Sequence, residues 1–133
     1  MRHPLETFRA RQAPLVSRLT YTLDCRDAER LSAFWAEVLG YSSHGGRGSF
    51  WPLVPPESLE EPWFVLQEVS EPKSGKNRMH LDIHVTDLEG EAKRLEALGA
   101  RRISEDAVVQ STYSWLVMAD PEGNEFCLVH PGE

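Results

Sequence analysis

The sequence predicts an α+β fold in which a strand–helix–three-strand unit, βαβββ, occurs twice in tandem. Three observations predict it. An alternating apolar and polar run leads into a helical apolar stripe, and the same order returns some sixty residues later. Each helical stretch is then followed by short strand-like runs separated by turn residues.

The first unit begins with an alternating strand over residues 19–25, where apolar side chains occupy every second position. Residues 27–39 then place apolar side chains at the spacing of one helix face. They are Leu31, Phe34, Trp35, Val38 and Leu39. Asp27 is the expected N-cap, and Gly40 suits the left-handed residue that ends a helix.

The second unit repeats this order. Residues 80–85 alternate as a strand, and an apolar stripe with helical spacing runs from Leu88 to Leu98 before Gly99. Thr86 and Glu89 have the spacing of a capping box, which predicts Thr86 as the N-cap of this helix.

Six further strands complete the two units. They are expected around residues 41–44, 49–53 and 63–69 in the first unit, and around 100–104, 113–119 and 125–130 in the second. Residues 70–77 have linker composition. We therefore expect an N-terminal arm over residues 1–15 and one domain over 16–133, with module one at 16–70 and module two at 78–131.

Composition excludes several classes of protein. The chain has 133 residues, a formal net charge of -7 and a pI of about 5.2, which argues against a nucleic-acid binder with a basic face. It has no apolar run long enough to span a membrane and no apolar signal segment. Cys25 and Cys127 show no zinc-motif spacing, so we expect a cytoplasmic protein with reduced thiols.

Three motifs carry a family resemblance. They are LDCRD at residues 23–27, running into AFW at 33–35 and LGY at 39–41; KNRMHLD at 76–82; and ADPEGNEF at 119–126. With the doubled unit, they resemble the vicinal oxygen chelate superfamily of glyoxalase I, extradiol dioxygenases, and fosfomycin-resistance and bleomycin-binding proteins. The resemblance is narrowest to short bacterial glyoxalase-like domains. It implies that the modules curl into an open half-barrel around a cleft.

The resemblance also implies where metal-using relatives place their ligands, one on each of four strands. In this chain those positions fall on Thr20, Gln67, His80 and Cys127. His80 matches the family pattern, whereas neutral Thr20 and Gln67 are weak ligands for divalent cations. The sequence therefore favours a site without a metal or other cofactor. A divalent metal held through His80 is the less favoured alternative.

His80, Asp82 and His84 share one face of their strand because strand side chains alternate. His80 is the best candidate for a catalytic residue, since imidazole exchanges protons near neutral pH and Asp82 could orient it. A purely structural role for these polar side chains stays open. Trp115 is a candidate wall for a ring-bearing ligand, as are Trp51 and Trp63, although such residues often belong to a core.

These observations leave several functions open. The leading hypothesis is a metal-independent small-molecule-binding protein, or a divergent enzyme, whose ligand contacts include Thr20, Gln67, His80, Asp82, Trp115 and Cys127. The alternatives are a metal-dependent lyase or dioxygenase, a drug-sequestering protein of the bleomycin-resistance kind, and an interaction module with a cleft filled by its own side chains. Single-domain relatives generally pair, so we expect a homodimer with no nucleic-acid or membrane partner.

Overall fold

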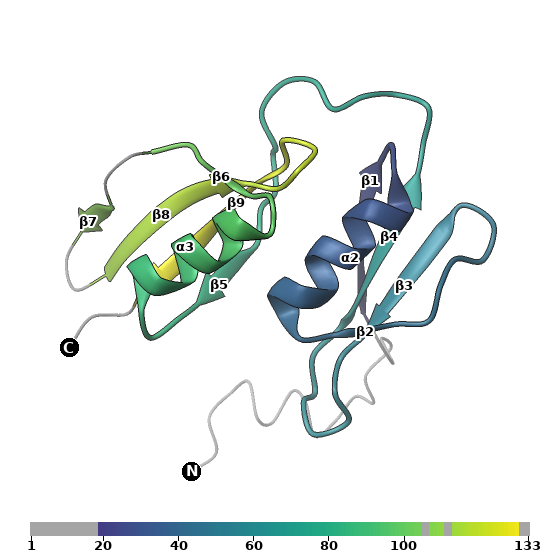
Figure 1. Cartoon of the computed structure of the whole chain (residues 1–133), viewed down its shortest axis with the longest axis horizontal. Helices are drawn as coiled ribbons and strands as arrows, with labels where there is room; N and C mark the ends of the chain where they lie inside the picture. Colours follow the sequence, from purple (N-terminus) through teal and green to yellow (C-terminus); the bar gives the residue numbers. More distant parts are fainter. Residues whose placement is uncertain (1–18, 105–106, 111–112, 131–133) are drawn as a thin grey trace, which may run out of the picture.

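The computed structural model describes residues 19–104, 107–110 and 113–130. Figure 1 shows two units side by side, each with one long helix packed against a β-sheet, and no closed barrel. This α+β arrangement confirms the doubled strand–helix–three-strand order. The expected N-terminal arm lies outside the described residues.

The first unit forms a four-stranded sheet in the order β1-β4-β3-β2. Its elements are β1 (Thr20–Cys25), α2 (Ala28–Leu39), β2 (Ser42–Ser43), β3 (Phe50–Val54) and β4 (Trp63–Glu68). β1 pairs with β4 in parallel and the other pairs are antiparallel. The apolar stripe of α2 is buried against one face of this sheet, as its helical spacing predicts.

The second unit forms a sheet in the order β5-β9-β8-β6, with β7 added beside β8. Its elements are β5 (Asp82–His84), α3 (Leu88–Ala97), β6 (Arg101–Arg102), β7 (Val108–Gln110), β8 (Tyr113–Ala119) and β9 (Glu125–His130). β7 was not predicted, because three partly polar residues give too short a run for a strand pattern.

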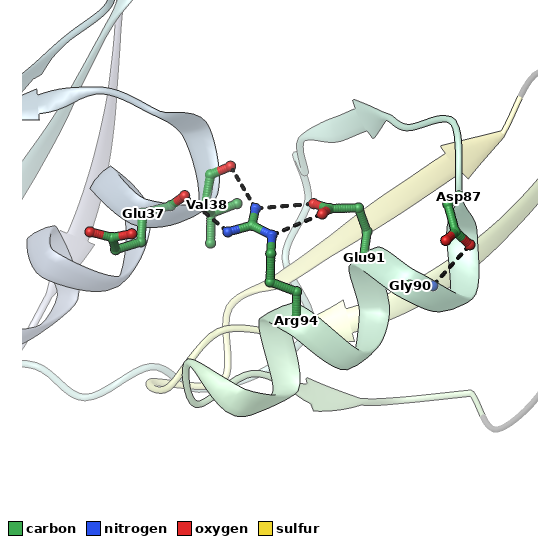
Figure 2. A network of polar contacts seen from close by, with 6 residues as sticks. All are labelled: Glu37, Val38, Asp87, Gly90, Glu91 and Arg94. Carbon is green, nitrogen blue, oxygen red and sulfur yellow. Dashed lines mark hydrogen bonds and ion pairs between the residues drawn. The ribbon is translucent and has the colours of Figure 1, made fainter.

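The helix caps agree with the sequence in α2 and differ in α3. The Asp27 carboxylate accepts from the Arg30 amide at 3.1 Å, and Gly40 ends α2 in the left-handed region at φ 70°. In α3 the N-cap is Asp87, whose carboxylate accepts from the Gly90 amide at 3.0 Å (Figure 2). The predicted Thr86–Glu89 capping box is therefore wrong, because the helix begins one residue later than the box requires.

Trp35 joins the two units through the shared core. Its ring stacks on Phe64 from the first sheet, with centroids 5.2 Å apart, and meets Phe126 from the second sheet edge-on at 5.0 Å. Its indole Nε1–H donates to Asp120 Oδ2 at 3.0 Å, in the turn between β8 and β9. An indole combines a large apolar area with one polar group that needs a hydrogen-bond partner when buried. Here the ring contacts aromatic side chains of both units, and the hydrogen-bond partner belongs to the second unit.

The second unit also contacts both ends of α2. At the N-terminal end, the Glu122 carboxylate accepts from the amides of Arg26 and Asp27 at 2.8 and 2.9 Å. A negative charge is favourable there because the first helical amides lack partners and the helix dipole is positive.

At the C-terminal end of α2, Arg94 of α3 supplies the complementary positive charge (Figure 2). Its Nη1 and Nη2 atoms donate to the carbonyls of Glu37 and Val38 at 3.4 and 3.5 Å. Its Nε donates to the Glu91 carboxylate at 2.8 Å, which orients the guanidinium. Contacts at both ends and at the core thus fix α2 to the second unit.

We predict that Trp35→Phe lowers the free energy of unfolding by about 1–3 kcal/mol, because the buried Asp120 carboxylate then loses a donor while most of the aromatic area stays. Urea denaturation followed by circular dichroism measures the loss. The matched control is Trp51→Phe, at a half-buried tryptophan with no described hydrogen bond from its indole. Equal losses in the two variants would contradict the importance of the bond to Asp120.

Candidate functional site

A cavity of about 710 Å³ lies on the face of the second sheet that α3 does not cover. The cavity is open to solvent. The alternative of an interaction module implies a cleft filled by the protein's own side chains, and this face of the second sheet does not have one. Its lining residues are Lys76, Asn77, His80, Asp82, His84, Tyr113, Trp115, Val117, Glu125, Phe126, Cys127 and Val129.

Strand alternation puts these side chains on one face. In β9, Phe126 and Leu128 are buried in the core, so the alternating residues Cys127 and Val129 point to the opposite face and line the cavity. Strand pairing then aligns these side chains in two rows that run across the sheet. Asp82, Cys127 and Val117 form one row. His84, Val129 and Trp115 form the other.

The apolar part of the cavity is built around Trp115 and Tyr113 on β8, with Val117 and Val129 beside them. Trp115 is half-buried, while Tyr113 keeps 48% of its surface exposed, so both rings offer area to a ligand. The other two candidate tryptophans lie elsewhere. Trp51 packs against the core, and Trp63 is a strand residue of the first sheet.

The polar end of the cavity is formed by His80, Asp82 and Cys127. His80 Nε2 lies 3.1 Å from Asp82 Oδ1, which is the orienting contact expected for a histidine beside a carboxylate. The ligand atoms of these three residues all lie within 4.8 Å of one another. His80 and Asp82 are about half exposed, whereas Cys127 is buried.

Both thiols are held in the protonated form. Burial raises the pKa of Cys127, and the negative charge and hydrogen bond of Asp82 raise it further. Burial also raises the pKa of Cys25 to about 12, with the carboxylates of Glu122 and Glu68 adding to the effect. Neither cysteine is therefore an activated nucleophile in this state.

The four positions that the resemblance associates with a metal are divided between the two sheets. Thr20 and Gln67 lie on β1 and β4 of the first sheet and are not among the residues that line the cavity. His80 and Cys127 do line it. Because Thr20 and Gln67 are also neutral oxygen donors, this four-residue set does not fit a hard divalent cation.

The sequence indicated His80, Asp82, Trp115 and Cys127, and the structure places all four in one cavity. It did not indicate Asn77, Tyr113, Val117, Glu125 or Val129. Alternation could have indicated the four that lie on β8 and β9, because they occupy the same parity as Trp115 and Cys127. Asn77 lies in the loop before β5, where alternation gives no signal. Lys76, which also lines the cavity, pairs with Glu125 at 3.1 Å.

The chain matches a known protein family over most of its length. The family model described as a glyoxalase-like domain matches residues 20–129, nearly the whole described chain. The protein belongs to the glyoxalase-like domain family. It is thus a member of the vicinal oxygen chelate superfamily, as the three sequence motifs implied.

Solved structures share this glyoxalase-like fold. A glyoxalase/bleomycin resistance protein/dioxygenase family enzyme from Burkholderia phytofirmans superposes with a TM-score of 0.70 at 20% identity, covering 86% of this chain and 98% of its own. The fosfomycin resistance protein FosX from Listeria monocytogenes, in complex with Mn(II) and 1S,2S-dihydroxypropylphosphonic acid, gives 0.68 at 20% identity, covering 90% and 93%. A family member from Nocardioides gives 0.68 at 15%, covering 98% and 95%.

At these identities the structural neighbours establish the fold and leave the chemistry to this chain's own residues. No match is found among proteins of curated function. Among the described residues, no helix has the length and apolar character needed to cross a membrane.

We predict that Asp82→Asn speeds alkylation of Cys127. The raised pKa of Cys127 leaves little thiolate at neutral pH. Removing the Asp82 charge lowers the pKa of Cys127 and increases the thiolate fraction. The measurement is the iodoacetamide rate against pH in a Cys25→Ser background, where Cys127 is the remaining thiol.

In this experiment the pH midpoint of alkylation should fall in Asp82→Asn and stay unchanged in Asp24→Asn, an exposed carboxylate on the first sheet. An unchanged midpoint in Asp82→Asn would show that Asp82 does not act on the thiol.

Proposed function

We propose that this glyoxalase-like protein binds a small molecule, with a partly aromatic or aliphatic body, in the cavity of its second sheet. The observation that carries the proposal is the combination of an apolar wall around Trp115 with one polar end at His80 and Asp82. Such cavities bury the body of a ligand and orient it through a few polar groups.

Binding of the ligand's body needs no metal ion in this proposal. Burial of about 100 Å² of apolar surface contributes about 2.5 kcal/mol by itself. Thr20 and Gln67 are weak donors on the other sheet, which supports the same view. Whether bound molecules are sequestered or transformed depends on His80, which Asp82 orients for proton exchange if the site is catalytic.

A basic ligand suits this polar end best. Asp82 faces the cavity with His80 beside it, whereas the positive charge of Lys76 is offset by Glu125. The net charge of -7 adds a field that attracts cations. This charge balance supports the drug-sequestering version of the function, in which a basic compound is held without chemical change.

The expected outcome of a thermal-shift screen with an aromatic and aliphatic fragment library, run in EDTA, is stabilisation by a subset of fragments. Trp115→Ala should remove those shifts, because it removes the wall of the cavity. Trp51→Ala is the matched control, since this half-buried tryptophan lies on β3 of the first sheet and does not line the cavity. The proposal fails if no fragment stabilises the protein, or if fragments stabilise Trp115→Ala as strongly as the parent.

We further propose a homodimer. Phe50 on the first sheet is 45% exposed and pairs with Gln67 of β4. By strand alternation, half-buried Val65 and Trp63 lie further along β4 on the same face as Gln67. Apolar side chains on the sheet face that α2 does not cover favour a protein partner, and a second copy is the simplest one.

Size-exclusion chromatography with light scattering should give twice the 15.1 kDa mass of the chain at micromolar concentration. Val65→Lys should shift the protein towards the monomer, because it places a charge within the proposed interface. Glu57→Lys, at an exposed loop residue, should leave the mass unchanged. A parent protein that elutes with the monomer mass would refute the dimer.

We propose that the arm ends near residue 15 and that the two modules extend over 16–70 and 78–131; the described sheets, from Thr20 to Glu68 and from Asp82 to His130, are compatible with these bounds. Two unpaired cysteines support a cytoplasmic location.

A further inference from the structure

Two carboxylates line the cavity, and each already has a partner within the chain. Asp82 Oδ1 lies 3.1 Å from His80 Nε2. Glu125 Oε1 lies 3.1 Å from Lys76 Nζ, and Lys76 lines the cavity as well. On the basis that the cavity binds a small molecule, as proposed above, we propose that Glu125 is a second binding point for a ligand's ammonium group. Lys76 occupies this point in the free protein, and the cavity therefore selects ring-bearing diamines.

The sheet register fixes where the two carboxylates lie. Asp82 pairs with Cys127 across β5 and β9, and Glu125 lies two residues before Cys127 on the same face. With a rise of about 3.3 Å per residue and about 4.8 Å between strands, the Cα atoms of Asp82 and Glu125 lie about 8 Å apart. A ring seated over Val117 and beside Trp115 then has the two carboxylates on different sides, as the amino groups of a meta-substituted diamine require.

The ion pair of Lys76 and Glu125 is an exchangeable contact. The Lys76 side chain keeps 80% of its surface exposed, whereas the Glu125 side chain keeps 18%. An ion pair with one partner in water contributes little to stability, because it orders a long side chain and solvent screens its charges. Asn77 holds the adjoining backbone, since its Oδ1 accepts from the Glu125 amide at 3.3 Å. The Lys76 side chain can therefore rotate away while the linker keeps its contact with β9.

A ligand ammonium competes well for Glu125 once the body of the ligand is bound. With the ring beside Trp115 and a first ammonium at Asp82, the second ammonium is already held near Glu125, and a tethered group has a high effective concentration. The Glu125 carboxylate is largely shielded from water, which strengthens its attraction for a charge inside the cavity. Lys76 thus sets specificity, because a monoamine leaves the ion pair in place and a diamine replaces it.

The test compares three ring-bearing probes by isothermal titration calorimetry of the full-length protein in EDTA. The probes are m-xylylenediamine, with two amino groups; m-methylbenzylamine, with one; and m-(aminomethyl)benzoate, in which a carboxylate replaces the second amine. The parent protein should bind the diamine about fivefold more tightly than the monoamine, since the second ammonium gains the contact with Glu125. The zwitterion should bind most weakly, because its carboxylate faces that of Glu125.

Variants of the ion pair separate the roles of its two members. Lys76→Met should raise the affinity for the diamine about threefold, because the competing ammonium is gone, and leave that for the monoamine unchanged. Glu125→Gln should lower the affinity for the diamine to that for the monoamine, and in the double variant Lys76→Met/Glu125→Gln the gain should disappear. Lys73→Met removes the same charge from the same linker at a residue that does not line the cavity, and should leave every affinity unchanged. Circular dichroism checks that each variant is folded.

The second ammonium site is overturned if the parent protein binds the diamine no more tightly than the monoamine, or if Lys76→Met weakens diamine binding. Tightest binding by the zwitterion, lost in Lys76→Met, would also overturn it, by showing that Lys76 receives an anionic group. If fragments of the wider screen bind but none of these probes does, the diamine preference fails and the proposed function stands. If neither fragments nor probes bind, both fail.

Discussion

The buried carboxylate of Asp120 is the constraint on which the rest of the structure depends. It accepts hydrogen bonds from the Trp35 indole, from the Asn124 side chain, and from the amides of Glu122 and Asn124. Burial raises the pKa of Asp120, and these donors oppose that rise by stabilising the charge. Burying a carboxylate with fewer hydrogen-bond donors would destabilise the fold. The turn between β8 and β9 must therefore keep the conformation that supplies these donors.

The geometry of the cavity follows from this constraint. With the turn fixed against α2, Phe126 and Leu128 enter the core, and Cys127 and Val129 must face the other way. A slip of one residue in β9 would turn the cavity side chains towards the core and the core side chains towards the cavity, so register and cavity are specified together. The cavity is therefore formed by rigid strands, which suits binding with little reorganisation.

The sequence predicted the parts of the fold that depend on periodicity. Both helices, the strands that precede them and the α2 caps follow from local patterns, because apolar spacing records which face is buried. The N-cap of α3 could not be chosen from spacing alone, since adjacent Thr86 and Asp87 both have side chains that cap.

The sequence also indicated part of the candidate site, namely polar and aromatic residues such as His80 and Trp115. Val117 and Val129 were not indicated, because apolar strand residues look alike whether they face a core or a cavity.

The central claim is that ligands occupy the open face of the second sheet. Amide chemical-shift mapping by NMR, with a stabilising fragment added to ¹⁵N-labelled protein, tests it most directly. The account predicts that shifts concentrate on β5, β8 and β9, with the largest near Trp115 and Asp82. Shifts centred on β1 and β4 around Thr20 and Gln67, with the second sheet unaffected, would contradict it.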